Sequence, residues 1–150
     1  MASPQTSRSQ ASASLRSFVI DCPDPASLAS FYAALLGGRA DTSDPQWCEV
    51  HFDEGSRPGS VKLAFQSVSS YEAPRWPDGV PQQAHLDLTV SDLEASSRLA
   101  VQLGARVLSG PVEEPGSIFV VHSDPAGHPF CLCEDREPPR DAARGVEVGG

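Results

Sequence analysis

The sequence has very little lysine: Lys62 is the only one, beside ten arginines and twenty acidic residues, and the formal net charge is −9. The basic residues gather nowhere into a stripe, which excludes a nucleic-acid-binding role. No apolar run approaches the roughly eighteen residues that span a bilayer. We therefore expect no nucleic-acid and no membrane partner. The acidic surface favours cationic small molecules, or serves only to keep the protein in solution.

The first fourteen residues do not resemble an export signal, because they lack a charged start followed by an apolar block. A cytoplasmic location is the expectation. In that compartment cysteines stay reduced. We therefore expect four thiols, at Cys22, Cys48, Cys131 and Cys133.

The length of 150 residues is that of one domain with one core. Residues 1–14 and 134–150 have little to bury, so we expect disordered tails there. The folded domain is expected over 15–133. It divides into a first module at about 15–68, a proline-rich linker at 69–83 and a second module at about 84–133.

A repeated pattern defines the two modules. In residues 17–22 polar and apolar side chains alternate, which predicts a half-buried strand. An apolar stripe at helical spacing follows, with Asp24 as its N-cap and Gly37 at its end. The same strand and helix recur from residue 85, with Asp92 as the cap and Gly104 at the end.

Further strands are expected after each helix. In the first module they are residues 47–52 and 61–68, joined by a glycine and proline turn at 53–60. In the second they are residues 105–109, 117–123 and 129–134, the last two joined by a tight turn. The chain is therefore expected to have an α+β fold of two modules, each a strand, a helix and a run of antiparallel strands.

This repeat, the segment PRWPDGVPQQAHLDLTV and the closing DPAGHPFCLC together resemble the vicinal oxygen chelate superfamily. The resemblance is to its glyoxalase-like and bleomycin-resistance-like branch, and it covers about residues 15–133. It implies two βαβββ modules in an open, curved, eight-stranded mixed sheet around a concave small-molecule cavity. It also implies that a second copy often completes this cavity, so we expect a homodimer.

In the metal-using members of this superfamily, the first and last strands of each module supply four ligands to a divalent ion. The ion then stabilises negative charge on two adjacent substrate oxygens. The matching positions here are His85 and Cys131 in the second module, with Ser17 and either Ala64 or Gln66 in the first. Only His85 is a good ligand, so His85 and Cys131 are the metal candidates, and we expect no metal cofactor.

The last strand brings two cysteines to one face, since Cys131 and Cys133 alternate with Phe130 and Leu132. Their side chains run parallel, which disfavours a disulfide. A zinc site with His122 or His128 is an alternative, although the cysteine spacing is unusual for one. We favour two small thiols beside a bound ligand. His128, next to the turn glycine, is expected to face solvent.

Other residues have two open interpretations each. Trp47, Glu49 and His51 share a strand face that either lines the cavity or lies exposed. The linker aromatics Tyr71 and Trp76 either cap the cavity or pin the linker to the core. Asp21 and Asp87, on the polar faces of the two first strands, either act as a base or cation site or bond to a neighbouring strand.

The sequence thus predicts a protein that binds a small organic molecule, for sequestration or resistance. The alternative is an enzyme, a lyase, isomerase or dioxygenase acting on vicinal oxygens with His85 and Asp87 as the catalytic candidates. A third interpretation is a scaffold whose pocket is filled by its own side chains. The predicted ligand-binding residues are Ser17, Trp47, Glu49, His51, Gln66, Trp76, His85, Asp87, Cys131 and Cys133.

Overall fold

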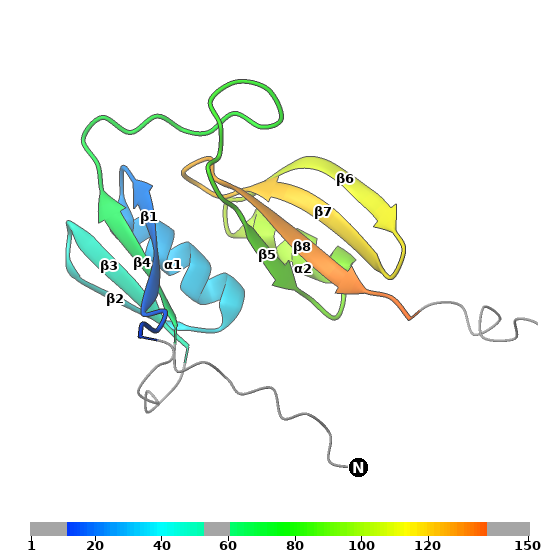
Figure 1. Cartoon of the computed structure of the whole chain (residues 1–150), viewed down its shortest axis with the longest axis horizontal. Coiled ribbons are helices and arrows are strands. Elements are labelled where there is room, and N and C mark those ends of the chain that lie inside the picture. The colour runs from blue at the N-terminus through cyan, green and yellow to red at the C-terminus, as the bar shows by residue number, and fades with distance from the viewer. Residues whose placement is uncertain (1–11, 53–60, 138–150) are drawn as a thin grey trace, which may run out of the picture.

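A computed structural model describes residues 12–52 and 61–137 (Figure 1). The expectations for residues 1–11, 53–60 and 138–150, which cover most of both tails and the first hairpin turn, lie outside the described residues. The first module contains β1 (Ser17–Cys22), α1 (Pro25–Leu36), β2 (Arg39–Asp44), β3 (Trp47–His51) and β4 (Lys62–Ser67). The second contains β5 (Leu86–Thr89), α2 (Leu93–Gln102), β6 (Arg106–Glu114), β7 (Ser117–Ser123) and β8 (Pro129–Asp135).

The strands form two mixed sheets of four, in the orders β1-β4-β3-β2 and β5-β8-β7-β6. In each sheet the first strand runs parallel to the last, and the other pairs are antiparallel. The α+β class and the two βαβββ modules are confirmed. The described strands are hydrogen-bonded as two separate sheets of four, one in each module.

Both helices begin at the aspartates that the sequence predicts. The Asp24 carboxylate accepts a hydrogen bond from Ser27 N at 3.2 Å, and that of Asp92 accepts one from Ala95 N at 3.0 Å. Each satisfies a backbone N–H that the first turn leaves without a partner. Helix α1 ends at Gly37, whose φ of 73° is the left-handed conformation that glycine adopts without strain.

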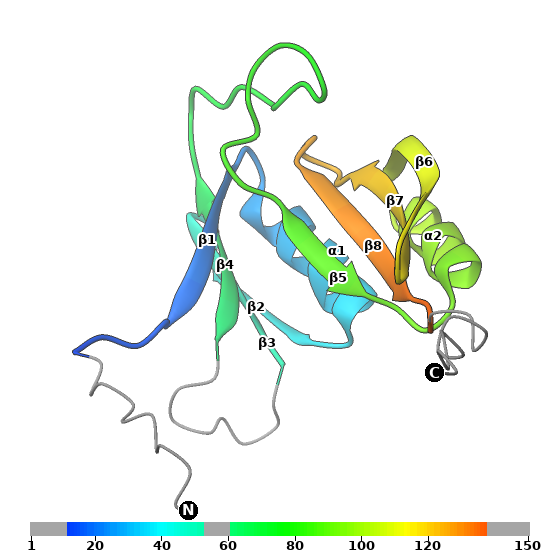
Figure 2. The same cartoon turned by 45° about the vertical axis from the view of Figure 1, so that its right-hand side comes forward.

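Helix α1 supplies the core that the two modules share. It packs on β2, β3 and β4. The Tyr32 ring stacks on Phe65 of β4, with centroids 5.6 Å apart, and lies 6.2 Å from Phe130 of β8. Figures 1 and 2 show α1 lying between the two sheets, whereas α2 covers only the second sheet. The apolar faces of both sheets are therefore buried against helices.

The opposite face of each sheet carries no helix, and we call it the open face. In the first module it presents Ser17, Val19, Asp21, Trp47, Glu49, His51, Ala64 and Gln66, and in the second His85, Asp87, Thr89, Cys131 and Cys133. No helix among the described residues is long and apolar enough to cross a membrane.

Three differences from the predicted strands appear. Strand β2 was not predicted, because five of its six residues are exposed and no apolar alternation marks it. Strand β6 extends to Glu114, beyond the predicted residues 105–109, through two shifts in its register with β7. Strand β8 extends one residue beyond the predicted 129–134, to Asp135, so the sheet includes the first two residues of the expected tail at 134–150. The Glu134 carboxylate accepts a hydrogen bond from Leu93 N at 2.7 Å, at the start of α2.

Candidate functional site

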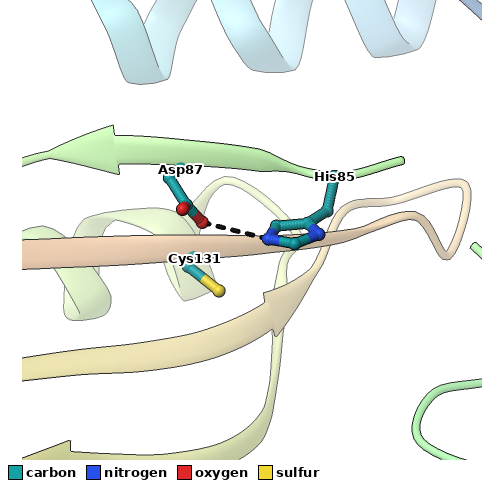
Figure 3. Close-up of side chains that lie close together, drawn as sticks. All are labelled: His85, Asp87 and Cys131. Atoms are coloured by element: carbon teal, nitrogen blue, oxygen red, sulfur yellow. Dashed lines mark ion pairs between the residues drawn. The ribbon is translucent and has the colours of Figure 1, made fainter.

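Three potential ligand groups meet on the open face of the second module (Figure 3). His85 precedes β5, Asp87 lies on β5, and Cys131 is the register partner of Asp87 on β8. Their nitrogen, oxygen and sulfur atoms all lie within 4.8 Å of one another. His85 Nε2 lies 3.2 Å from Asp87 Oδ1. We call these three residues the His85 cluster.

The electrostatics of the cluster keep its sulfur protonated. Burial, followed by the charge of the Asp87 carboxylate, raises the pKa of the Cys131 thiol to about 12. The side chains of His85 and Asp87 are 41% and 66% exposed, so a ligand can reach the cluster from solvent. The site offers an imidazole, a carboxylate and a thiol to that ligand.

The strand register identifies the first-module counterparts of this cluster. Asp87 pairs with Cys131, and in the first module Val19 pairs with Ala64. Ala64, rather than Gln66, is therefore the counterpart of Cys131. Because Ala64 has no ligand atom and Ser17 is a weak ligand, the first module supplies no strong metal ligand at the family positions.

Three other predicted residues also meet, but on the open face of the first module. Glu49 Oε1 accepts hydrogen bonds from Lys62 Nζ at 2.8 Å and Trp47 Nε1 at 3.0 Å, and Oε2 lies 3.0 Å from His51 Nε2. Although burial opposes ionisation, the hydrogen bonds from Lys62 and Trp47 keep the pKa of Glu49 below its usual value. This carboxylate is therefore ionised, with its partners in place. Nothing in the described chain joins this group to the His85 cluster.

A cavity of about 290 Å³ lies between the modules, and we call it the intermodule cavity. Residues from β1, α1, β5, the linker and the turn before β8 line it; they include Phe18, Asp21, Tyr32, Tyr71, Glu72, Gln82, Gln83, His85 and His128. Of the predicted ligand-binding residues, only His85 lines it. Trp76 and Gln66 lie outside its lining.

The linker enters β5 through a strained turn at the cavity wall. Ala84 N donates a hydrogen bond to Gln82 O at 2.7 Å, which closes a three-residue turn. The central residue, Gln83, has a φ of 61°, whereas the other described residues with positive φ are glycines. Such a turn is rare and costs energy, and strain of this kind is often kept at functional sites. His85 lies two residues after Gln83, so this turn helps to set its position.

Beneath the cavity lies a buried network that the sequence did not predict. His128 Nδ1 lies 2.8 Å from Asp124 Oδ2, and Nε2 lies 2.8 Å from the carbonyl oxygen of Asp21. Both partners are hydrogen-bond acceptors, an arrangement that favours the ring with protons on both nitrogens. Burial opposes this charge, but the Asp124 carboxylate outweighs it and raises the pKa of His128.

Two tyrosine hydroxyls extend this network. The Tyr32 hydroxyl donates to Asp124 Oδ2 at 2.7 Å, and the Tyr71 hydroxyl donates to the Ala126 carbonyl at 2.7 Å. Tyr71 therefore ties the linker to the second module. The prediction that His128 faces solvent is wrong, because its side chain is only 17% exposed. A motif search could have noted Asp124, since an aspartate that opens a DPxG turn often bonds to the backbone that follows.

The zinc alternative for the two cysteines is also wrong. His122 lies on the helix-covered face, where its Nε2 lies 2.8 Å from Ser97 Oγ, and His128 is held by Asp124. All four cysteines are free thiols. Cys131 and Cys133 are half-buried on the open face, whereas Cys22 and Cys48 are buried in the core.

The His85 cluster fits a borderline divalent ion such as Zn²⁺ better than Mg²⁺ or Ca²⁺. Zinc accepts nitrogen, oxygen and sulfur together, and catalytic zinc sites use three protein ligands with a fourth position open. The ligand atoms, no more than 4.8 Å apart, need only a small closure to reach one ion. Asp87 lies outside the family's ligand positions, and the sequence predicted it as a base, a cation site or a ligand-binding residue but not as a partner of His85 and Cys131 in a metal site.

Comparison with known proteins gives one family and a consistent fold. A model of the glyoxalase-like domain matches residues 17–133. A glyoxalase/bleomycin resistance protein/dioxygenase family enzyme from Burkholderia phytofirmans PsJN is 16% identical, with a TM-score of 0.64 over 83% of this chain and 100% of that one. A glyoxalase-related enzyme from Fulvimarina pelagi is 16% identical, with a TM-score of 0.60 over 81% and 87%.

A third structure, a virulence protein from Salmonella typhimurium, is 20% identical, with a TM-score of 0.56 over 83% of this chain and 98% of that one. No curated protein matches the sequence. Identities this low establish the fold and leave the activity to be argued from the site.

Proposed function

The chain belongs to the glyoxalase-like domain family of the vicinal oxygen chelate superfamily, and from this membership and the site geometry we propose that it binds a small organic molecule. The molecule would occupy the intermodule cavity and contact the His85 cluster. One observation carries this proposal: His85 both lines the cavity and belongs to the cluster. A ligand in the cavity can therefore present a polar group to His85, Asp87 and Cys131.

The cavity has the properties of a small-ligand site. Its volume of about 290 Å³ is close to the lower end of the usual range for such sites. Apolar side chains from both modules and the linker line it, together with polar groups that can fix a ligand's orientation. Binding without reaction, as in sequestration or resistance, requires only these features.

A screen with fluorinated fragments, followed by ¹⁹F NMR, tests this proposal. Fragments that bind should shift the amide signals of residues lining the cavity. The His85→Ala variant should weaken the binding of these fragments at least several-fold. Cys133→Ser is the matched control, because Cys133 shares the open face but lies outside the cluster. Fragments that bind only in the groove of about 900 Å³ between α2 and β6 would contradict the proposal, as would a screen without hits.

An enzyme that uses a divalent metal is the second candidate, and the cluster of three ligand types favours it. His85, Asp87 and Cys131 would hold the ion. When bound, it would supply positive charge to stabilise an oxyanion on a vicinal-oxygen substrate. His85 and Asp87 would also orient that substrate from the open side of the sheet.

Cobalt substitution tests the metal site without an activity assay. If Co²⁺ binds to the cluster, the protein should gain the near-ultraviolet charge-transfer band of a thiolate–cobalt bond. Cys131→Ser should abolish this band, and Asp87→Asn should weaken Co²⁺ binding at least tenfold. Cys133→Ser should leave both unchanged. If all variants bind Co²⁺ equally, the metal candidate is wrong.

We further propose that the protein is a homodimer in which the open faces are covered. On the open face of the first module, the large apolar side chains of Val19 and Trp47 are exposed. Exposed apolar patches commonly mark interfaces. Light scattering after gel filtration should give a mass of two chains, and Val19→Glu should convert it to one. A wild-type mass of one chain would contradict this proposal.

A further inference from the structure

The intermodule cavity lies where two sheet edges approach each other. Strands β1 and β5 are edge strands of their sheets, and residues of both line the cavity. In Figure 1 these two strands lie on the sides of the sheets that face each other. Tyr32 of α1 and the linker add to the wall. The cavity is therefore assembled only when both modules and the linker are in place.

The charges around this cavity are of one sign. Asp21 and Glu72 line it with exposed carboxylates, and no lysine or arginine is among the described residues that do so. His128 in the wall lies 2.8 Å from the Asp124 carboxylate, so any positive charge on its ring has a negative partner. That buried pair cancels its own charge. The two carboxylates therefore leave the cavity net negative.

The other residues that line the cavity suit a ligand with an apolar skeleton and polar groups. Phe18, Pro74 and Pro81 supply apolar surface, while Gln82 and Gln83 supply amides. An ammonium group next to carboxylates gains Coulomb energy, and more so where protein partly replaces water. Its methyl groups can pack on aromatic rings, which attract cations to their faces.

We propose that the intermodule cavity selects small organic cations, with the Asp21 and Glu72 carboxylates as the counter-charges. This inference rests on the proposed function, because it assigns a ligand class to the same cavity. An organic anion would face two carboxylates and is rejected. A neutral molecule of the same shape keeps the packing and loses the charge interaction, so it binds more weakly.

Two probes of equal shape test the selection: choline and 3,3-dimethylbutan-1-ol, in which carbon replaces the charged nitrogen. Each is titrated into ¹⁵N-labelled protein, and the dissociation constant is taken from the amide shifts of cavity residues. Choline should bind about tenfold more tightly at low salt, and the difference should shrink as salt screens the charges. Asp21→Asn and Glu72→Gln should each remove several-fold of the preference.

Asp135→Asn is the matched control, because it removes a carboxylate at the far end of β8, outside the cavity, and should leave the preference unchanged. If both probes bind at the cavity equally well, the cation selection is wrong, whereas the binding function stands. If the Asp135→Asn variant loses as much preference as Asp21→Asn, the overall charge of the protein and not the cavity is responsible, which also overturns the inference. If neither probe shifts cavity signals, both proposals fail for these molecules.

Discussion

At the scale of single residues, His128 has the largest structural role that the sequence did not predict. Its ring joins the turn before β8, through Asp124, to the end of β1, through the carbonyl of Asp21. A histidine beside a turn glycine is usually exposed, and local sequence carries no sign of a partner 107 positions away. Only the packing of the two modules creates that partner. Long-range contacts of this kind are the part of a site that sequence patterns do not reveal.

The raised pKa of His128 predicts a pH-dependent stability. A histidine whose pKa is higher in the folded state stabilises fully below its unfolded pKa, and this contribution is lost as pH rises through the folded pKa. The free energy of unfolding lost on His128→Gln should therefore be larger at about pH 6 than at about pH 8.5. Urea unfolding at both values measures it. A loss that is equal at both values would show that folding does not raise the pKa of His128.

Cys131 gives a second residue-scale prediction. Since its pKa is about 12, the thiol should react slowly with iodoacetamide near neutral pH, where thiolate is the reactive form. Asp87→Asn removes a negative charge that opposes ionisation, so Cys131 should then be labelled several-fold faster. Peptide mapping by mass spectrometry measures the rate.

Asp135→Asn serves as the control for this labelling. The Asp135 charge contributes to the raised pKa of Cys133 and is not among the causes for Cys131. This variant should therefore speed labelling of Cys133 alone. Equal labelling of Cys131 with and without Asp87 would mean that burial alone controls the thiol.

At the scale of elements, the sequence predicts best where burial has a period. The β1 and α1 patterns and both aspartate caps are observed, because one buried face leaves a regular trace in the sequence. Strand β2 leaves none: it is held by backbone hydrogen bonds to β3, and its side chains face solvent. Strand register is also not written in the sequence pattern, so only the strand pairing shows that Ala64 is the counterpart of Cys131.

The connection from α1 to β2 yields a prediction for two adjacent glycines. A Cβ at Gly38 would lie 2.8 Å from Val50 Cγ1 and 3.0 Å from the His51 carbonyl oxygen, so β2 or β3 would have to move. Gly38→Ala should destabilise the protein by about 1–3 kcal/mol, as overpacking does. Gly37 has open space around it and requires only positive φ, which asparagine tolerates.

Gly37→Asn is therefore the matched variant, and it should cost less than about 1 kcal/mol. Denaturant midpoints of the two variants, measured with equal slopes, separate the effects. If Gly37→Asn is the more damaging of the two, the close approach of Gly38 to β3 does not limit this connection.

At the scale of the whole molecule, the two modules depend on one aromatic cluster. Phe130 of the second module is fully buried, and its ring lies 6.0 Å from Phe31 and 6.2 Å from Tyr32 of the first. The repeated sequence suggests two similar units, each with its own core. In the structure, α1 instead packs against residues of both modules. The two modules are therefore not expected to fold or open independently. The intermodule cavity and its wall depend on this contact.

The last prediction concerns this shared core. Phe130→Ala should lower the free energy of unfolding by about 3–5 kcal/mol, because it leaves a cavity between the modules. Both tryptophans, Trp47 and Trp76, lie outside the second module, so their fluorescence reports on the first module and the linker. Their unfolding midpoint should nevertheless shift as far as the midpoint measured by circular dichroism, since one transition unfolds both modules.

Phe52→Ala provides the comparison, because Phe52 is a large aromatic side chain that is 39% exposed and lies outside the shared cluster. It should cost less than about 1 kcal/mol, the usual range for exposed sites. A Phe130→Ala variant whose tryptophan signal unfolds at the wild-type midpoint, while circular dichroism shows earlier loss of structure, would mean that the first module is stable by itself. The modules would then be coupled only through the linker, and the cavity between them could open without loss of either core.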